Sequence, residues 1–287
     1  MIERLNFYDV YGYLLPGLAL LGVAWFPFSL VAGWTLPGAL SSALFALVVA
    51  YVAGHLLQGL VRTALPQQRP EKGTRLPSDY LLDENDPGLT NGVRARVIDL
   101  VLAHFSLDVG TAPNVAERTA RRKDAFLLCR RALIQQKAGS YAEQFQGMYA
   151  LMRGLAAVAA LSASYHFGWS GGRLIPLGAV TWIGLGLVGL ALVGVGLLFA
   201  RRVSESRVFW ALALALLPLG AVLSSSFKTV SSLGTTDIAV LLVVALGSLF
   251  AFHQFRRSYQ YFGEEFAATV YRDFFVLNQM TTSARGR

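Results

Sequence analysis

Four polar residues in the N-terminal part of the chain have the types and spacing to form one site. They are Asp9, Tyr13, His55 and Gln58. His55 and Gln58 are one helical turn apart in an otherwise apolar run, and a titratable group in such a place is a functional hypothesis by default. These side chains could form a polar cluster at the inner membrane interface with a role in ligand binding or gating. The simpler interpretation, which we favour, is that His55 donates to a helix carbonyl or a tyrosine and fixes helix packing.

A second group of chemically active residues is basic and falls between residues 114 and 138. It comprises Arg118, Arg121, Arg122, Lys123, Arg130, Arg131 and Lys137. One interpretation is a solvated face that enforces membrane topology. Another is contact with anionic lipid headgroups, where each basic residue gains about 1 kcal/mol. A third is binding of a cytoplasmic protein or an anionic small molecule. Nucleic acid is disfavoured because no aromatic residues alternate with the basic ones for base stacking.

Glycines at 184, 186 and 189 match the dinucleotide-binding fingerprint letter by letter, but that loop needs a strand before it and a helix after it. Here the match lies inside an uncharged apolar run. Small residues on one face of a membrane helix let another helix approach closely. We therefore expect a packing seam formed by Gly178, Gly186, Gly189 and Gly196.

Metal and cofactor chemistry find little support in the sequence. The acidic run from Asp83 to Gly88 resembles a calcium loop only faintly, because Pro87 and Arg94 stand where ligands should be. We interpret it as a solvated turn. The four histidines lie in separate elements without partners at ligand spacing, and the single cysteine cannot form a disulfide within the chain. We expect no metal and no cofactor, and no catalytic residues are assigned.

The elements that must position these residues are membrane helices. Of the 287 residues 54% are apolar and only 15% are charged, against about 25% charged in a soluble domain. Between Asp9 and Arg62 there are 52 consecutive uncharged residues, enough for two spans of about 20 residues each. The same reasoning along the chain predicts six spans: Tyr13 to Val31, Ala39 to Leu60, Ala150 to Phe167, Leu174 to Ala200, Val208 to Phe227 and Ile238 to Phe255.

The loop charges predict the orientation, since Lys and Arg remain on the cytoplasmic side. With both termini inside, 23 of the 25 basic residues are cytoplasmic, and only Arg173 and Lys228 lie outside. Arginine outnumbers lysine 21 to 4, a bias that we expect of a GC-rich bacterial genome. The expected location is therefore a bacterial inner membrane, with several passes and both termini in the cytoplasm.

The soluble parts are predicted to be helical. A polar linker from residue 66 to 88 should precede helices at Gly92 to Phe105 and Asn114 to Ala138. A capping box at Ser140 and Glu143 should begin a helix that continues into the third span. An aromatic stripe after the sixth span predicts a further helix that runs well past the membrane. The stripes on these last two helices could pack on each other, on residues 93–138 or on a neighbouring subunit.

The sequence thus predicts an all-α, polytopic integral membrane protein. Its parts are residues 1–61 with two spans, a cytoplasmic insert at 62–147, four spans at 148–255, and a cytoplasmic helix and tail at 256–287. The predicted spans contain no Asp or Glu, which disfavours ion-coupled transporters. We expect a non-enzymatic homo-oligomer in the lipid bilayer, a channel-like or membrane-perturbing effector or sensor controlled by its cytoplasmic part. The alternatives are a membrane-embedded enzyme or lipid-binding protein at the inner interface, or a structural subunit.

Overall fold

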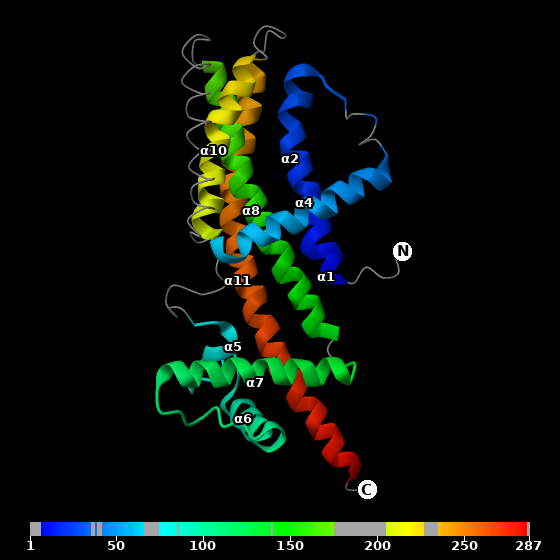
Figure 1. Ribbon diagram of the computed structural model, residues 1–287, viewed down its shortest axis with the longest axis vertical. Coiled ribbons are helices and arrows are strands. Elements are labelled where there is room, and N and C mark those ends of the chain that lie inside the picture. The colour runs from blue at the N-terminus through cyan, green and yellow to red at the C-terminus, as the bar shows by residue number, and fades with distance from the viewer. Residues whose placement is uncertain are drawn as a thin grey trace. The chain divides into compact units, whose positions relative to one another are not determined.

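Helices account for all regular structure in the part of the chain that the structure describes. This computed structural model describes residues 7–35, 38, 42–65, 75–84, 86–138, 140–174, 205–226 and 235–285. Within these ranges the all-α prediction is confirmed. The chain divides into two compact units (Figure 1). Unit 1 is drawn from Met1–Pro66 and Ala150–Arg257, and unit 2 from Gln67–Tyr149 and Ser258–Arg287.

Unit 1 contains the apolar helices. In chain order its elements are α1 (Phe7–Asp9), the π-helix η2 (Val10–Leu14), α2 (Leu15–Ala32), α4 (Ala43–Ala64), the second part of α8 (Ser140–Leu174), α10 (Glu205–Ser226) and the first part of α11 (Thr235–Arg285). Inside this unit α8, α10 and α11 run side by side (Figure 1).

Five described helical stretches are long and apolar enough to cross a membrane, which indicates a multi-pass membrane protein. They are Val10–Val31, Ala43–Arg62, Tyr141–Gly172, Arg207–Ser226 and Thr236–Gln279. Each of these stretches contains or overlaps one of the predicted spans, five of the six in all. Residues 175–200, which make up nearly all of the predicted fourth span, lie outside the described residues, as does the predicted seam of Gly178, Gly186, Gly189 and Gly196.

Glycines bring helix backbones into direct contact at several places in the described part of unit 1. A Cβ on Gly54 would lie 1.9 Å from the carbonyl oxygen of Tyr13, so only glycine fits where α4 meets η2. A Cβ on Gly168 would lie 2.1 Å from the carbonyl oxygen of Leu217, which shows an equally close approach of α8 to α10. Membrane helices associate through such small residues because lipid offers no hydrophobic driving force between them.

Unit 2 surrounds its own apolar core. It consists of α5 (Pro77–Tyr80), α6 (Asn91–Phe105), α7 (Val115–Gln135), the first turns of α8 and the later part of α11. Its largest buried apolar side chains come from α5, α6, α7 and α11 and from the loop after α5. They include Tyr80, Leu81, Leu82, Val97, Leu133, Tyr271 and Phe274. A core built from five segments explains why this part of the chain folds as one unit.

The predicted helices of unit 2 are confirmed by the structure. α6 ends at Phe105 as predicted, and α7 follows Asn114, whose Oδ1 accepts a hydrogen bond from the Glu117 N–H at 2.8 Å. α8 begins at Ser140, and it runs without interruption to Leu174. α7 ends at Gln135, three residues earlier than predicted.

The aromatic stripes pack inside unit 2, a point that the sequence left open. The stripe on α8 contacts the stripe on α11 through Phe145 and Phe262, whose ring centroids are 6.3 Å apart. The α11 stripe also contacts α7, where Phe126 and Phe266 meet edge to face at 5.7 Å. The stripes therefore pack both on each other and on residues 93–138, which are two of the three arrangements that the sequence allowed.

The prediction that residues 66–88 form an irregular polar linker is wrong for the second half of this range. Pro77 does not prevent a helix but begins α5, since proline suits the first helical position, where its missing N–H is not needed. Tyr80, Leu81 and Leu82, which follow at once, are among the most buried residues of unit 2. This segment was misjudged because its apolar residues are few and adjacent, and they form no periodic pattern.

Replacing Gly54 by alanine should destabilise unit 1, because the new methyl group would overlap the Tyr13 carbonyl. We expect a loss of more than about 3 kcal/mol, at or above the upper end for overpacked cores. The matched control is Gly59→Ala on the same helix, where a Cβ meets nothing within 4 Å. Alanine there should be neutral or stabilise by up to about 1 kcal/mol. Thermal unfolding in detergent, followed by tryptophan fluorescence, measures both, and equal effects would contradict the packing described.

Candidate functional site

A buried arginine on α6 holds the irregular segment that connects α5 to α6. We call this segment, residues 81–84 and 86–90, the braced loop. Arg94 is only 4% exposed. Its guanidinium donates to Asn91 Oδ1 at 2.7 Å and to four backbone carbonyls of the loop, those of Leu81 (3.2 Å), Glu84 (2.7 Å), Leu89 (2.7 Å) and Asp86. A guanidinium has five N–H groups, so all five are paired.

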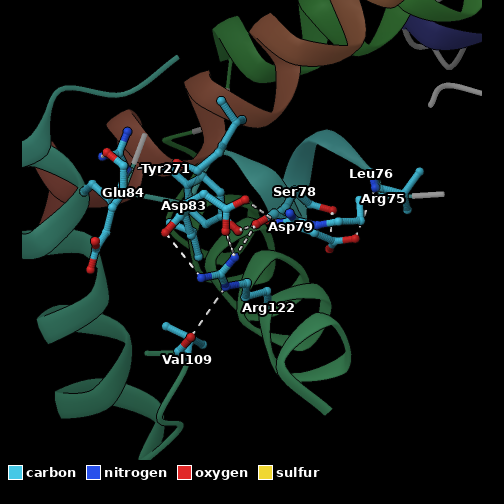
Figure 2. A network of polar contacts seen from close by, with 12 residues as sticks. Arg75, Leu76, Ser78, Asp79, Asp83, Glu84, Val109, Arg122 and Tyr271 are labelled. Atoms are coloured by element: carbon cyan, nitrogen blue, oxygen red, sulfur yellow. Dashed lines mark hydrogen bonds and ion pairs between the residues drawn. The ribbon is translucent and has the colours of Figure 1, made fainter. Parts of the chain in front are cut away.

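A second buried arginine, on α7, holds the start of the same segment (Figure 2). Arg122 donates to the carbonyl oxygens of Asp79 (3.0 Å), Leu82 (3.4 Å) and Val109 (3.5 Å), and to Asp83 Oδ1 at 2.5 Å. Buried carbonyls outside regular structure need a donor, because leaving one unpaired costs about 1–3 kcal/mol. Arg94 and Arg122 thus replace the hydrogen bonds that a helix or sheet would supply.

Asp83 is shared between Arg122 and Arg75, which lies 2.7 Å away. Burial alone would raise the pKa of Asp83, but the hydrogen bonds and charges of Arg122 and Arg75 outweigh it and lower that pKa. The ionised carboxylate therefore stabilises the fold above the ordinary pKa of an aspartate. This stabilisation is lost as the pH falls through the lowered value.

The segment at α5 is also tied to α11. The Tyr271 hydroxyl donates to the Ser78 carbonyl at 2.8 Å, and the Tyr80 hydroxyl donates to Glu264 Oε1 at 2.5 Å. Asp79 is buried beside them, and burial raises its pKa although the Leu76 N–H and the Ser78 hydroxyl donate to it. α5, α6, α7 and α11 are therefore linked by one polar network.

An open cavity of about 870 Å³ lies beside the braced loop. Its walls are formed by the loop, α6, α7 and Gly110, and the lining residues are Leu82, Asp83, Glu84, Asp86, Asn91, Arg94, Ala95, Ile98, Gly110, Arg118 and Arg122. A cavity of this size falls in the range that binds small molecules or peptide segments. Since Arg94 uses all its donors on the protein, the exposed Arg118 and Glu84 are the charged groups best placed to meet a ligand.

Among the described residues no group of three or more His, Cys, Asp or Glu could hold a metal ion. Cys129 of α7 is buried, and burial raises the pKa of its thiol to about 12. A thiol is a nucleophile only as the thiolate, so Cys129 serves the core.

The basic residues between positions 114 and 138 lie in different environments in the structure. Arg122 is buried in the network just described. Arg121 pairs with Glu117 at 2.5 Å and donates to the carbonyl oxygens of Asp108 and Thr111. Arg130 donates to Gln146 Oε1 at 2.8 Å and lies 5.6 Å from the centre of the Phe266 ring. The exposed members are Arg118, Lys123, Arg131 and Lys137.

In unit 1 the structure brings part of the predicted polar site together. The rings of Tyr13 and His55 stack with centroids 3.6 Å apart, and Tyr51 meets the His55 ring edge to face at 4.6 Å. The Tyr51 hydroxyl forms a hydrogen bond with Asp9. His55 is exposed at the surface of the unit. Tyr13, Tyr51 and His55 therefore form one aromatic cluster, and Asp9 lies beside it.

Gln58 has a different role from the one predicted. Its amide donates to the carbonyl oxygens of Gly12 (2.9 Å) in η2 and Ala150 (2.8 Å) in α8. Its Oε1 accepts from Nε (3.1 Å) and Nη2 (2.8 Å) of Arg153, which is also buried. Gln58 joins three helices and partly satisfies a buried cation. The sequence analysis missed Arg153 because it was counted among the loop charges, although it directly precedes an uncharged run.

A further polar group that the sequence did not single out lies deep in unit 1. His166 of α8 is fully buried, and its Nδ1 is 2.8 Å from the Ser162 carbonyl oxygen. The Ser162 hydroxyl lies 2.8 Å from that of Ser248 on α11. Within the described residues Nε2 of His166 has no hydrogen-bond partner. This line of polar groups connects α8 and α11 in the interior.

No protein-family model, curated protein or solved structure matches this chain. Function is therefore inferred from the geometry of the two units.

Replacing Arg94 by lysine should weaken unit 2. Lysine has three donors for five acceptors, so at least two of the acceptors lose their partner, and we expect a loss of about 2–4 kcal/mol. The matched control is Arg118→Lys, an exposed change that should stay within about 0.5 kcal/mol. The reaction of buried Cys129 with a maleimide, followed against urea concentration, measures the opening of unit 2. Equal midpoints for the two variants would show that Arg94 does not brace the loop.

Proposed function

We propose that the chain is a non-enzymatic, homo-oligomeric membrane protein, a channel-like or membrane-perturbing effector or sensor. In this proposal it resides in a bacterial inner membrane with both termini in the cytoplasm, and unit 2 is the cytoplasmic part that controls the membrane helices of unit 1. The distribution of basic residues supports this orientation, since 23 of 25 then lie inside.

The observation that carries the proposal is the continuity of two helices. α8 has 35 residues and α11 has 51, and each contributes residues to both units without a break. A continuous helix transmits a displacement of one end to the other, because its backbone hydrogen bonds resist local bending. A change in unit 2 would thus reach unit 1 through two helices.

Unit 2 has the features expected of the receiving part. α11 is tied to α5 by Tyr271 and Tyr80, and α5 leads into the braced loop that lines the cavity. Occupation of the cavity by a cytoplasmic protein segment or an anionic small molecule would alter the loop and, through this network, α11. We place the input at this cavity.

A second candidate function is lipid binding or chemistry at the inner interface by the cluster of Asp9, Tyr13 and His55. The observation that favours it is the stacked Tyr13 and His55 pair, which presents a titratable ring at the surface of unit 1. We rank it second, because Gln58 is occupied by backbone carbonyls and Arg153 and adds nothing to that surface.

The proposed function is tested by measuring membrane potential in bacteria with a voltage-sensitive dye. Cells that express the intact chain should be depolarised. Arg257→Pro should abolish this, since proline in a helix interior costs about 3 kcal/mol and breaks α11 at the limit between the units. Arg257→Ala, an exposed change that keeps the helix, should depolarise like the intact chain.

All variants are compared at equal amounts in the membrane fraction. Full polarisation by the intact chain, with or without added cytosolic extract in reconstituted vesicles, would contradict the proposal. Equal depolarisation by the proline and alanine variants would contradict the role of α11. If the channel-like function is contradicted and His55→Ala removes a lipid-dependent property of the protein, the second candidate function replaces the first.

A further inference from the structure

α7 presents two distinct faces, only one of which is explained by the fold of unit 2. The buried face consists of Arg122, Ala125, Cys129 and Leu133. On the opposite side, at the same helical spacing, lies a face that we call the outer face of α7, formed by Lys123, Leu127, Arg131 and Ile134. Leu127 is 48% exposed and Ile134 51%. Large apolar side chains, each about half exposed, therefore alternate with basic ones on this surface.

This alternation is typical of helices that lie in a membrane interface. There the apolar side chains enter the boundary with the acyl chains, while lysine and arginine extend to the headgroups. One acidic residue, Asp124, borders the outer face, which keeps a net positive charge. Of the basic residues of α7 that face elsewhere, Arg121, Arg122 and Arg130 are engaged within unit 2, and Arg118 lines the cavity.

The hydrogen bond from Arg130 to Gln146 fixes α7 beside the first turns of α8. In α8 the uncharged residues 154–172 lie between Arg153 and Arg173. These 19 residues span about 28 Å, close to the thickness of about 30 Å of a hydrocarbon core. Gln146 precedes this run by eight residues, about 12 Å along the helix. α7 is therefore joined to the turns of α8 that precede this uncharged run in the sequence.

We propose that the outer face of α7 docks on the anionic phospholipids of the adjacent leaflet. Leu127 and Ile134 bury their side chains at the headgroup boundary, and Lys123 and Arg131 pair with lipid phosphates. A second copy of the chain fits this face less well, because a symmetric contact would set one positively charged outer face against another. The contact exists whether or not the protein conducts ions, so it stands apart from the proposed function.

The test uses the full chain in lipid nanodiscs, with an environment-sensitive dye on a cysteine introduced by Leu127→Cys. The native Cys129 does not compete for the dye, because it is buried and its pKa is about 12. In discs that contain phosphatidylglycerol the emission should shift to shorter wavelength, and headgroup spin-labelled lipid should quench it. Discs of phosphatidylcholine alone should show neither effect. A dye at Leu102→Cys, an equally exposed position on α6, is the matched control and should not respond.

Adding Lys123→Gln and Arg131→Gln should weaken docking by about 30-fold, the equivalent of about 1 kcal/mol for each basic residue. Unchanged maleimide protection of Cys129 would show that these variants remain folded. Three results would overturn the proposal: the same response in neutral discs, the same response at Leu102, or no response at Leu127. A response that follows the number of chains per disc rather than the lipid would assign the outer face to a second copy, which also overturns it.

Discussion

The need to pair buried backbone carbonyls governs the fold of unit 2. Where the chain leaves the regular helix there, the guanidiniums of Arg94 and Arg122 supply the missing donors and hold the braced loop. Removing either guanidinium would leave buried acceptors without partners, which is why these contacts decide the local fold. In unit 1 a long polar side chain also joins segments far apart in the sequence, since the Gln58 amide donates to carbonyls that lie within η2 and α8.

The sequence predicted the features that arise from local patterns. Helical periodicity located α6 and α7, the Asn114 cap fixed where α7 begins, and the capping box located the start of α8. Uncharged length located the five described spans. In the sequence Arg94 is noticeable only because it stands where a calcium loop would have a ligand. The acidic run before it is interpreted as a solvated turn. Its five acceptors become neighbours only when the loop folds around it, so no spacing rule could have revealed this role.

The candidate sites show the same division between local and long-range information. The contact between Tyr13 and His55 follows from two neighbouring helices and was expected. Arg153 was not, because a charge at the end of an uncharged run resembles a topological signal until its partner, 95 positions away, is known. The basic residues of α7 were treated as one group, yet Arg122 belongs to the interior and Lys123 to the surface. Consecutive residues on a helix are about 100° apart, so each had to be assigned separately.

The central claim is that the two arginines make the loop between α5 and α6 part of the folded core. Hydrogen–deuterium exchange on the intact protein in nanodiscs tests it most directly. In the braced loop, the Leu81 and Asp83 amides donate to carbonyls of α5, and the Asp86 and Gly88 amides donate within the loop. These amides should exchange as slowly as those of α6 and lose their protection in Arg94→Ala, while α2 and α4 remain unchanged. Exchange within seconds in the unaltered protein, or protection that survives Arg94→Ala, would contradict the account.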